Sequence, residues 1–412
     1  MGATATTGDV RTYGYVTAAY WADTITDGAI RVLVLFYFYQ LGYSPLQVAS
    51  LFVFYELFGV ITNLFGGWIA ARWGLKSTLV GGLSLQIGAL LMLALAPAAW
   101  FVVPYVMVSQ AVSGVAKDLT KMSAKSAVKM LVPSGQSDVL FRWVAALTGS
   151  KNALKGVGFF LGGVLLTVVG FRASLMILAV FVAAALVLVL VAVHGGLGQG
   201  SATARFTHMF SNTRAVNLLS AARVFLFASR DVWFVVALPV YLRSVLGWTF
   251  WEVGGFMAIW VIGYGIVQGF APRLLRRSGG HVPGGGTATW LAFLLALFPA
   301  GIALALGADI DPTTVLVVGL ILFGVVFALN SSVHSFLILD YADGDKVAMN
   351  VGFYYMANAM GRLAGTILSG LIYQWQGLEA CLWASAAMVL VAALISLTLP
   401  RAARRPHADA FA

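Results

Sequence analysis

Long apolar stretches alternate along this chain with short segments rich in glycine, proline and charged residues. An α-helix needs about 20 apolar residues to cross the hydrocarbon layer of a bilayer, and each stretch is long enough for one crossing. The pattern therefore predicts twelve membrane-spanning helices. They are expected at residues 13–40, 46–71, 78–97, 101–129, 139–169, 172–193, 214–243, 250–271, 287–307, 313–339, 348–374 and 378–399.

A polar segment interrupts this series after the sixth helix. It divides the chain into an N-terminal six-helix bundle (1–193), a cytoplasmic linker (194–213), a C-terminal six-helix bundle (214–400) and a cytoplasmic tail (401–412). We thus expect an all-α integral membrane protein made of two six-helix pseudo-repeats.

The composition agrees with lipid as the main solvent. The chain has 412 residues, of which 60% are hydrophobic and 10% charged, and its mean hydropathy is +0.91. A soluble domain is roughly half apolar and a quarter charged. No stretch remains for a soluble catalytic domain, so we expect no enzyme. The one cysteine, Cys381, excludes an internal disulfide and a multi-thiolate metal site, and we predict neither a metal nor a cofactor.

Basic residues are distributed unevenly between the two sets of loops. Among the loops after odd-numbered helices, only Arg172 and Arg243 are basic. The other loops and the tail contain Arg72, Lys76, Lys125, Lys129, Arg205, Arg273, Arg276, Arg277, Lys346, Arg401, Arg404 and Arg405. Cytoplasmic loops carry the excess of Lys and Arg, so both termini and the linker are predicted to be cytoplasmic in a bacterial inner membrane. The net charge of +10 follows this topology and indicates no nucleic-acid partner.

Charged residues inside the predicted spans also follow a pattern. The third, sixth, ninth and twelfth helices carry none at depth, and the helix at 250–271 shares this property. Ionisable groups at membrane depth normally face a water-filled path or one another. A period of three is expected if each half consists of two three-helix repeats whose third helix faces lipid. This arrangement resembles that of the major facilitator superfamily.

The segment Gly67–Lys76 resembles the loop signature of the same superfamily. It departs from the signature at Ala71 and Leu75, where the family has an acidic residue and a second arginine, so the acid that supports the family's gating ion pair is missing from its usual position. In the helix at 139–169, glycines 156, 158, 162 and 163 form a small-residue seam. That seam fits close helix packing or a specific antiport role.

Five segments are similar to a narrower family, the ArsJ organoarsenical efflux permeases. They are Tyr20–Arg31, Ser113–Lys125, Leu147–Gly158, Asn217–Arg223 and Ser229–Pro239. The resemblance covers nearly the whole chain except the tails and the linker. It implies export of 1-arseno-3-phosphoglycerate and hence arsenate resistance, and we expect this export to be coupled to protons. It also implies a functional partner, glyceraldehyde-3-phosphate dehydrogenase, which makes that ester from arsenate.

Candidate substrate ligands come from the buried cations, because a ligand with two anionic ends suits two cationic groups. Lys151 and Lys155 share one face of their helix near mid-membrane, and Asn358 and Arg362 repeat that spacing in the equivalent helix of the second half. Further candidates are Arg223 and Arg230, seven residues apart on one helix, and Lys117 and Lys121, the inner part of a lysine stripe.

Proton coupling requires a group that gains and loses a proton inside the membrane. The candidates are Asp23, Asp27, Glu56 and His334. Asp27 is expected to pair with Arg31 one turn along the same helix, whereas Asp23 and Glu56 have no such neighbour in sequence. His334 could relay protons or form a hydrogen bond within the bundle.

Two alternatives stay open. The same fold could export another organic or sugar-phosphate anion, which the same cations would fit. An integral membrane enzyme is the second alternative. It should gather His, Asp or Cys side chains near one membrane face, but the five histidines are scattered along the chain, at 194, 208, 281, 334 and 407.

The loop charges predict the location of both chain ends. Reporter domains fused to either terminus should give cytoplasmic signals, such as fluorescence of a fused green fluorescent protein and no activity of a fused alkaline phosphatase. A phosphatase-active fusion at either end would overturn this topology.

Overall fold

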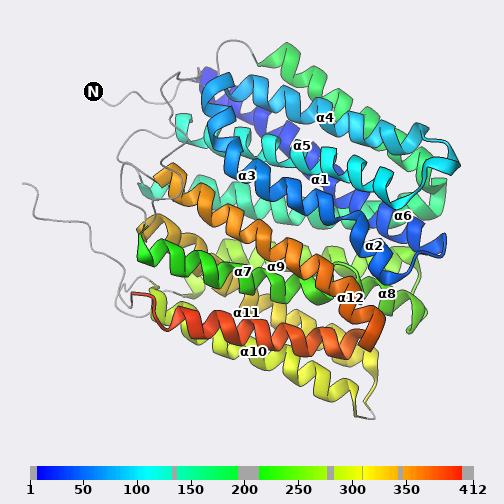
Figure 1. The fold of residues 1–412 in the computed structure, drawn as a ribbon. Coiled ribbons are helices and arrows are strands. Elements are labelled where there is room, and N and C mark those ends of the chain that lie inside the picture. Colours follow the sequence, from blue (N-terminus) through cyan, green and yellow to red (C-terminus); the bar gives the residue numbers. More distant parts are fainter. Residues whose placement is uncertain are drawn as a thin grey trace, which may run out of the picture.

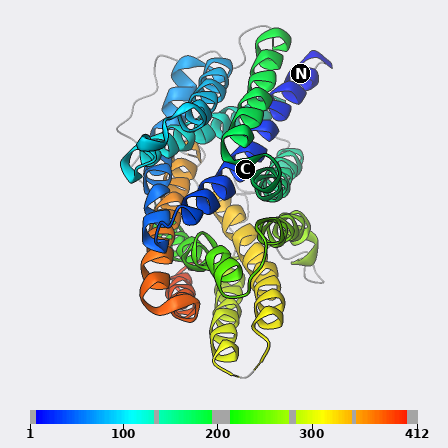
Figure 2. The same cartoon turned by 90° about the vertical axis from the view of Figure 1, so that its right-hand side faces the viewer.

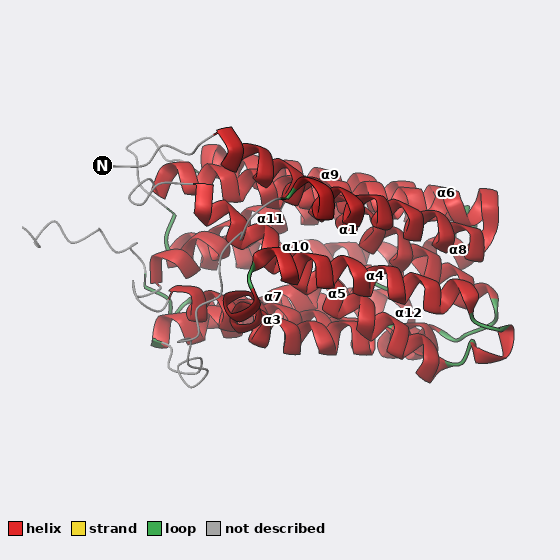
Figure 3. Cartoon of the chain, turned by 90° about the horizontal axis from the view of Figure 1, so that it is seen from above, coloured by secondary structure: helices red, strands yellow, loops and turns green. Residues whose placement is uncertain are grey.

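A computed structural model describes residues 7–131, 137–193, 213–275, 283–308, 310–341 and 347–400. In these ranges the regular structure is helical (Figure 3). The helices are α1 (Thr7–Gln40), α2 (Pro45–Leu51), α3 (Val53–Trp73), α4 (Leu75–Leu95), α5 (Val103–Leu131), α6 (Ser137–Ala192), α7 (Arg214–Phe234), α8 (Ala237–Ser244), α9 (Phe250–Leu274), α10 (Gly285–Leu306), α11 (Pro312–Tyr341) and α12 (Val347–Ser396). A 3₁₀ turn spans Ala98–Trp100.

Two of these helices turn back on themselves. α6 and α12 are 56 and 50 residues long and contain Gly170 at φ 77° and Gly377 at φ 74°. Glycine takes this left-handed conformation without a Cβ clash, so the chain reverses there. Each long helix thus makes two crossings, which separates 137–169 from 171–192 and 347–376 from 378–396. With α2–α3 and α7–α8 counted as one crossing each, the twelve predicted crossings are confirmed.

Eight helical runs in the described residues are long and apolar enough to cross a membrane. Two of them are the folded-back helices α6 and α12. α1 and α5 complete the twelve crossings but fall outside this set. They are the helices with dense internal charge, Asp23 to Arg31 in α1 and Lys117 to Lys121 in α5. These two crossings therefore contribute several of the charged groups of the interior.

The predicted helix 214–243 is wrong in one respect, because it is broken in the middle. α7 ends at Phe234 and α8 begins at Ala237. Pro239 lacks the N–H that would bond to the carbonyl of Val235. The N–H groups of Val236 and Ala237, at the start of α8, donate to the Ser369 hydroxyl, at 3.2 and 3.1 Å. The predicted helix 46–71 is also divided, into α2 and α3 at Phe52.

Each half contains one very close helix pair in the equivalent position. In the first half α1 packs on α6, where a Cβ on Gly158 would come within 2.2 Å of the Ile25 carbonyl oxygen. In the second half α7 packs on α12, where a Cβ on Gly361 would come within 2.2 Å of the Val224 carbonyl oxygen. Only glycine permits this approach. The halves form the upper and lower bundles of Figure 1.

The halves meet through α6 with α9 and through α3 and α2 with α12. The glycine seam of α6 divides between two partners. Gly158 and Gly162 face α1, whereas Gly156 and Gly163 face the backbone of α9. The seam therefore packs helices closely, as one of the two interpretations predicted. The described chain ends, at α1 and after α12, lie at the same end of the bundle (Figure 1).

The uncharged crossings lie on the outside of the bundle, as the period of three predicts. α10 and the second part of α12 sit at one edge in Figures 1 and 2, and α4 sits at the other. Their outward side chains are large and apolar, among them Leu85, Val180, Val191, Trp290, Leu297 and Leu394. These helices separate lipid from the charged interior.

Candidate functional site: a buried charge network between the halves

Five carboxylates lie near the middle of the crossings, and each is at most 3% exposed. They are Asp23 and Asp27 of α1, Glu56 of α3, Asp118 of α5 and Asp231 of α7. A charge in this low-dielectric interior is tolerated when a counter-charge and hydrogen bonds compensate for lost water. The partners of these carboxylates therefore define the site.

Asp27 joins α1 to α6 and α3. Its Oδ2 lies 2.7 Å from the Lys155 Nζ, and its Oδ1 accepts a hydrogen bond from the Tyr55 hydroxyl. The Tyr55 ring also lies under two cations, Lys117 at 4.0 Å and Arg31 at 4.7 Å from its centroid. Tyr55 thus links the carboxylate to its neighbouring cations.

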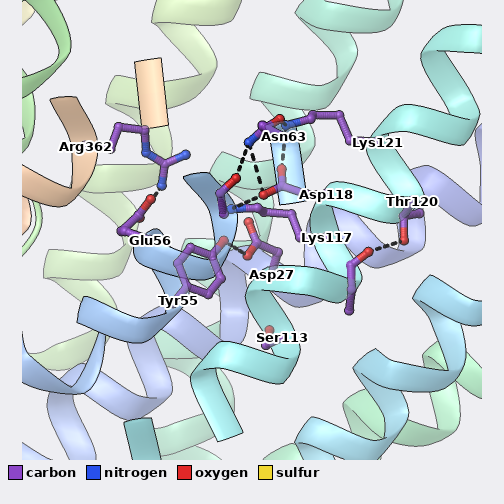
Figure 4. A network of polar contacts seen from close by, with 12 residues as sticks. Asp27, Tyr55, Glu56, Asn63, Ser113, Lys117, Asp118, Thr120, Lys121 and Arg362 are labelled. Atoms are coloured by element: carbon purple, nitrogen blue, oxygen red, sulfur yellow. Dashed lines mark hydrogen bonds and ion pairs between the residues drawn. The ribbon is translucent and has the colours of Figure 1, made fainter. Parts of the chain in front are cut away.

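Asp118 is held between two lysines of its own helix (Figure 4). Lys121 Nζ lies 2.5 Å from its Oδ1, and Lys117 Nζ lies 3.8 Å from its Oδ2. Asn63 of α3 completes the group, since its amide donates to Asp118 and its oxygen accepts from Lys121. The two candidate substrate lysines therefore share one carboxylate.

Glu56 connects the two halves of the molecule. Its Oε1 receives Arg31 Nη2 from α1 at 2.5 Å and Arg362 Nη2 from α12 at 2.6 Å. The predicted pair between Asp27 and Arg31 is therefore wrong. The spacing allows that pair, but the α1–α6 and α1–α3 contacts place stronger partners beside each residue.

Arg362 also reaches back into its own half. Its Nε lies 3.4 Å from Asp231 Oδ2, and Arg230 Nη2 lies 2.5 Å from Asp231 Oδ1. Lys155 and Arg362, the cations predicted to be equivalent, thus each contact the carboxylate of the first helix in their own half. The bond from Arg362 to Glu56 has no such counterpart at Lys155 among the described contacts.

Arg223 has a different environment. Its Nε donates to the Asn358 Oδ1 at 2.9 Å, and its Nη1 donates to the Ser331 carbonyl at 3.3 Å. Its guanidinium lies over the Phe227 ring at 4.0 Å, and Arg230 lies over the same ring at 4.8 Å. Arg223 and Arg230 share a face as predicted, whereas Asn358 binds Arg223 and not Arg362.

Two further candidates have buried atoms without a hydrogen-bond partner in the described part of the chain. Neither oxygen of Asp23 has one, and the nearby Thr120 hydroxyl donates to the Ala116 carbonyl. The Nδ1 of His334 is likewise without a partner. Lys151 lies one turn before Lys155 in α6 and is partly buried.

Some residues singled out by the sequence lie outside the described side chains. They are Lys125 and Lys129 of the lysine stripe and Gly67, Ala71 and Arg72 of the loop signature. Conversely, the sequence analysis missed Tyr55 and Asn63. Their only signal was position: Tyr55 precedes Glu56, and Asn63 lies two helical turns beyond it.

Comparison with known proteins identifies one sequence family. The Major Facilitator Superfamily is matched over residues 16–343 and again over 286–412. No functionally curated protein matches the sequence significantly.

Solved structures share the fold at low sequence identity. One is a POT-family transporter in complex with a thioalcohol-conjugated peptide, with a TM-score of 0.73, 16% identity and coverage of 94% of this chain and 95% of that chain. A POT-family transporter in complex with 5-aminolevulinic acid has a TM-score of 0.72 and 16% identity, and the match covers 94% of this chain and 95% of that chain. A mutant of the nucleoside transporter NupG has a TM-score of 0.72 and 15% identity, and the match covers 94% of this chain and 99% of that chain. This likeness shows the fold and leaves the cargo open.

The network predicts a strong coupling between Asp27 and Lys155. Asp27→Asn should lower the melting temperature of the purified protein, because it leaves a buried ammonium unpaired, at a cost of about 3–5 kcal/mol. Adding Lys155→Met should restore most of the loss. Melting curves of the wild type, both single variants and the double variant test this. Additive effects of the two substitutions would contradict the pairing.

Proposed function

Since this chain belongs to the major facilitator superfamily, we propose that it exports a small organic anion from the cytoplasm, with a proton moving in the opposite direction. The proposed cargo is the class that the ArsJ resemblance implies, an organoarsenical anion such as 1-arseno-3-phosphoglycerate.

The observation that carries this proposal is an excess of cations at membrane depth. Eight lie in the middle turns of the described crossings, against the five carboxylates. They are Arg31, Lys117, Lys121, Lys151, Lys155, Arg223, Arg230 and Arg362. An uncompensated charge in this interior is costly. A ligand with several negative charges would balance this excess of positive charge, whereas a cationic drug would increase it.

The placement of the cations suits a ligand with two anionic ends. Lys155 lies on the N-terminal half and Arg362 on the C-terminal half, each beside one carboxylate of its own half. An incoming oxyanion can replace a carboxylate as the partner of either cation. Arginine adds the planar fork that binds phosphate or arsenate through two N–H groups. A ligand bound between them would touch both halves, which is what alternating access requires.

The chain also argues against arsenite as the cargo. Arsenite is uncharged at neutral pH and binds proteins chiefly through several thiolates. The only cysteine, Cys381, is buried. Arsenite would bring no negative charge to this cation-rich interior.

Asp23 is the proposed proton carrier. The other four carboxylates of the network lie beside cations, so protonating one of them would leave those cations uncompensated. Protonation of Asp23 breaks no ion pair in the described structure. The charged groups that face it are Asp27 on its own helix and Lys117 and Asp118 of α5. Protonation of Asp23 would therefore change the electrostatic potential at Lys117 and Asp118.

Growth under arsenate tests the cargo. An arsenic-sensitive bacterial strain should gain arsenate resistance from the permease only when a glyceraldehyde-3-phosphate dehydrogenase is active, and it should gain no arsenite resistance. The comparison uses the permease alone, the dehydrogenase alone, and both. If the permease gives equal arsenate resistance in a strain without any such dehydrogenase, the organoarsenical assignment is wrong. Another organic or sugar-phosphate anion would then be the favoured cargo.

Transport into inverted vesicles tests the proton. Dehydrogenase, glyceraldehyde-3-phosphate, NAD⁺ and arsenate outside the vesicles generate the substrate, and respiration acidifies the interior. Asp23→Asn should abolish gradient-driven arsenic uptake but preserve exchange of substrate without a gradient, because the amide mimics the protonated carboxyl. Asp311→Asn is the matched control, since Asp311 is an exposed cap of α11. Gradient-driven uptake at the wild-type level by the Asp23 variant would rule out this role.

A further inference from the structure

The C-terminal half contains a second polar group that the ion-pair network does not include. It lies on α7, α11 and α12 and consists of Arg223, Asn330, Ser331, His334 and Asn358, hereafter the C-half cluster. Arg223 is only 5% exposed, yet no carboxylate lies within ion-pair distance of it in the described ranges. Its positive charge is met by neutral oxygens and by the rings of Phe227 and Tyr354, whose centroids lie 4.0 and 5.0 Å from its guanidinium.

Two side chains of α11 in this cluster have unused hydrogen-bonding capacity. Asn330 is fully buried, and neither its amide nitrogen nor its amide oxygen has a partner among the described residues. His334 is 1% exposed with its Nδ1 unpartnered, and it is close enough to Arg223 for the two groups to interact electrostatically. Buried polar groups in a folded protein are normally satisfied, so these groups indicate a missing partner.

Helix geometry places these groups on one side of α11. Residues 327, 330, 331 and 334 follow the i, i+3, i+4, i+7 spacing of a single face. Phe327 marks the direction of that face, because its ring contacts Phe227 of α7 and Tyr264 of α9. Asn330 and His334 therefore face the interior of the C-terminal half, as Arg223 does.

The cluster is also held by α9 of its own half, which links it to the other half. Ser331 Oγ accepts hydrogen bonds from the Tyr264 hydroxyl and from the Gln268 amide, both on α9. Gln268 in turn accepts a hydrogen bond from Asn152 of α6 at 2.8 Å. The cluster is thus connected to the α6–α9 contact between the halves.

We propose that the C-half cluster is a separate subsite for a tetrahedral oxyanion, in which Arg223 supplies the charge and Asn330 and His334 supply hydrogen bonds. The inference rests on the proposed function only in that the cargo is an anion. The subsite takes the phosphate end of the cargo, and the network around Lys155 and Arg362 takes the other end.

The chemistry of the cluster selects this ligand class. A phosphate monoester presents several acceptor oxygens and two negative charges near neutral pH. Arg223 uses only Nε and Nη1 within the described structure, so its Nη2 N–H groups are available to such oxygens. Because neutral side chains surround Arg223, no carboxylate must be displaced when the anion arrives. The Lys155 and Arg362 site lacks this property.

Equilibrium binding to the purified full-length protein tests the subsite independently of transport. The probes are 3-phosphoglycerate, inorganic phosphate, and glycerate, which lacks the phosphate. The wild type should bind 3-phosphoglycerate, phosphate should compete, and glycerate should bind at least about tenfold more weakly. Arg223→Gln should weaken 3-phosphoglycerate binding by at least about tenfold.

Asn330→Asp is the second variant. It puts a carboxylate on the face of α11 that contacts Arg223. This carboxylate should repel the phosphate group of the ligand, and it should stabilise the folded protein as a counter-ion for Arg223. It too should lose at least about tenfold in 3-phosphoglycerate affinity. The matched control is Arg172→Gln, because Arg172 bonds to the Ala96 carbonyl at the far end of the bundle. That variant should bind like the wild type.

The outcomes separate this proposal from the preceding one. If the wild type binds no phosphate-bearing probe, or if Asn330→Asp binds 3-phosphoglycerate as tightly as the wild type, the subsite is overturned whatever cells export. If binding follows the expected pattern but arsenate resistance fails, the organoarsenical cargo is wrong and the phosphate subsite stands.

Discussion

The cost of keeping charge away from water determines the interior of this protein. Five carboxylates and eight cations lie at the middle of a bundle whose outer helices carry apolar side chains toward lipid. Such groups persist only where opposite charges and hydrogen bonds replace the lost hydration. Asp27, Glu56, Asp118 and Asp231 meet this requirement through six cations, three of which come from other helices. Among the described residues, Asp23 and Arg223 form no ion pair, and they are the groups that we propose for a proton and an anion.

Close packing makes these contacts possible. Glycines bring α1 against α6 and α7 against α12, so that side chains of moderate length bridge neighbouring helices. The result is an approximate symmetry: Lys155 meets Asp27 in one half, and Arg362 meets Asp231 in the other. The symmetry is broken where Arg362 also contacts Glu56 across the halves. Under the proposed function, an anion that binds Arg362 competes with Glu56, so cargo binding and the link between the halves are coupled.

The success of the sequence predictions depended on how local each feature is. Helix positions, the two chain reversals and the charge-free outer helices follow from hydropathy, length and glycine, which are properties of short segments. The shared face of Arg223 and Arg230 also follows from spacing alone. The Asp27–Arg31 pair satisfied the same spacing rule and was wrong, because Lys155 and Tyr55 compete for Asp27 while Glu56 takes Arg31.

The sequence by itself thus determined the membrane fold, the two halves and the inventory of buried charges. Only the tertiary structure decided which charges neutralise one another, because each choice depends on neighbours that are distant in sequence. Glu56 and Arg362 are 306 residues apart and meet at 2.6 Å. It also identified Tyr55 and Asn63 as members of the network, and Asp23 and Arg223 as groups that form no ion pair with any described residue. A side chain's type reveals that it needs a partner, and its three-dimensional surroundings determine whether it has one.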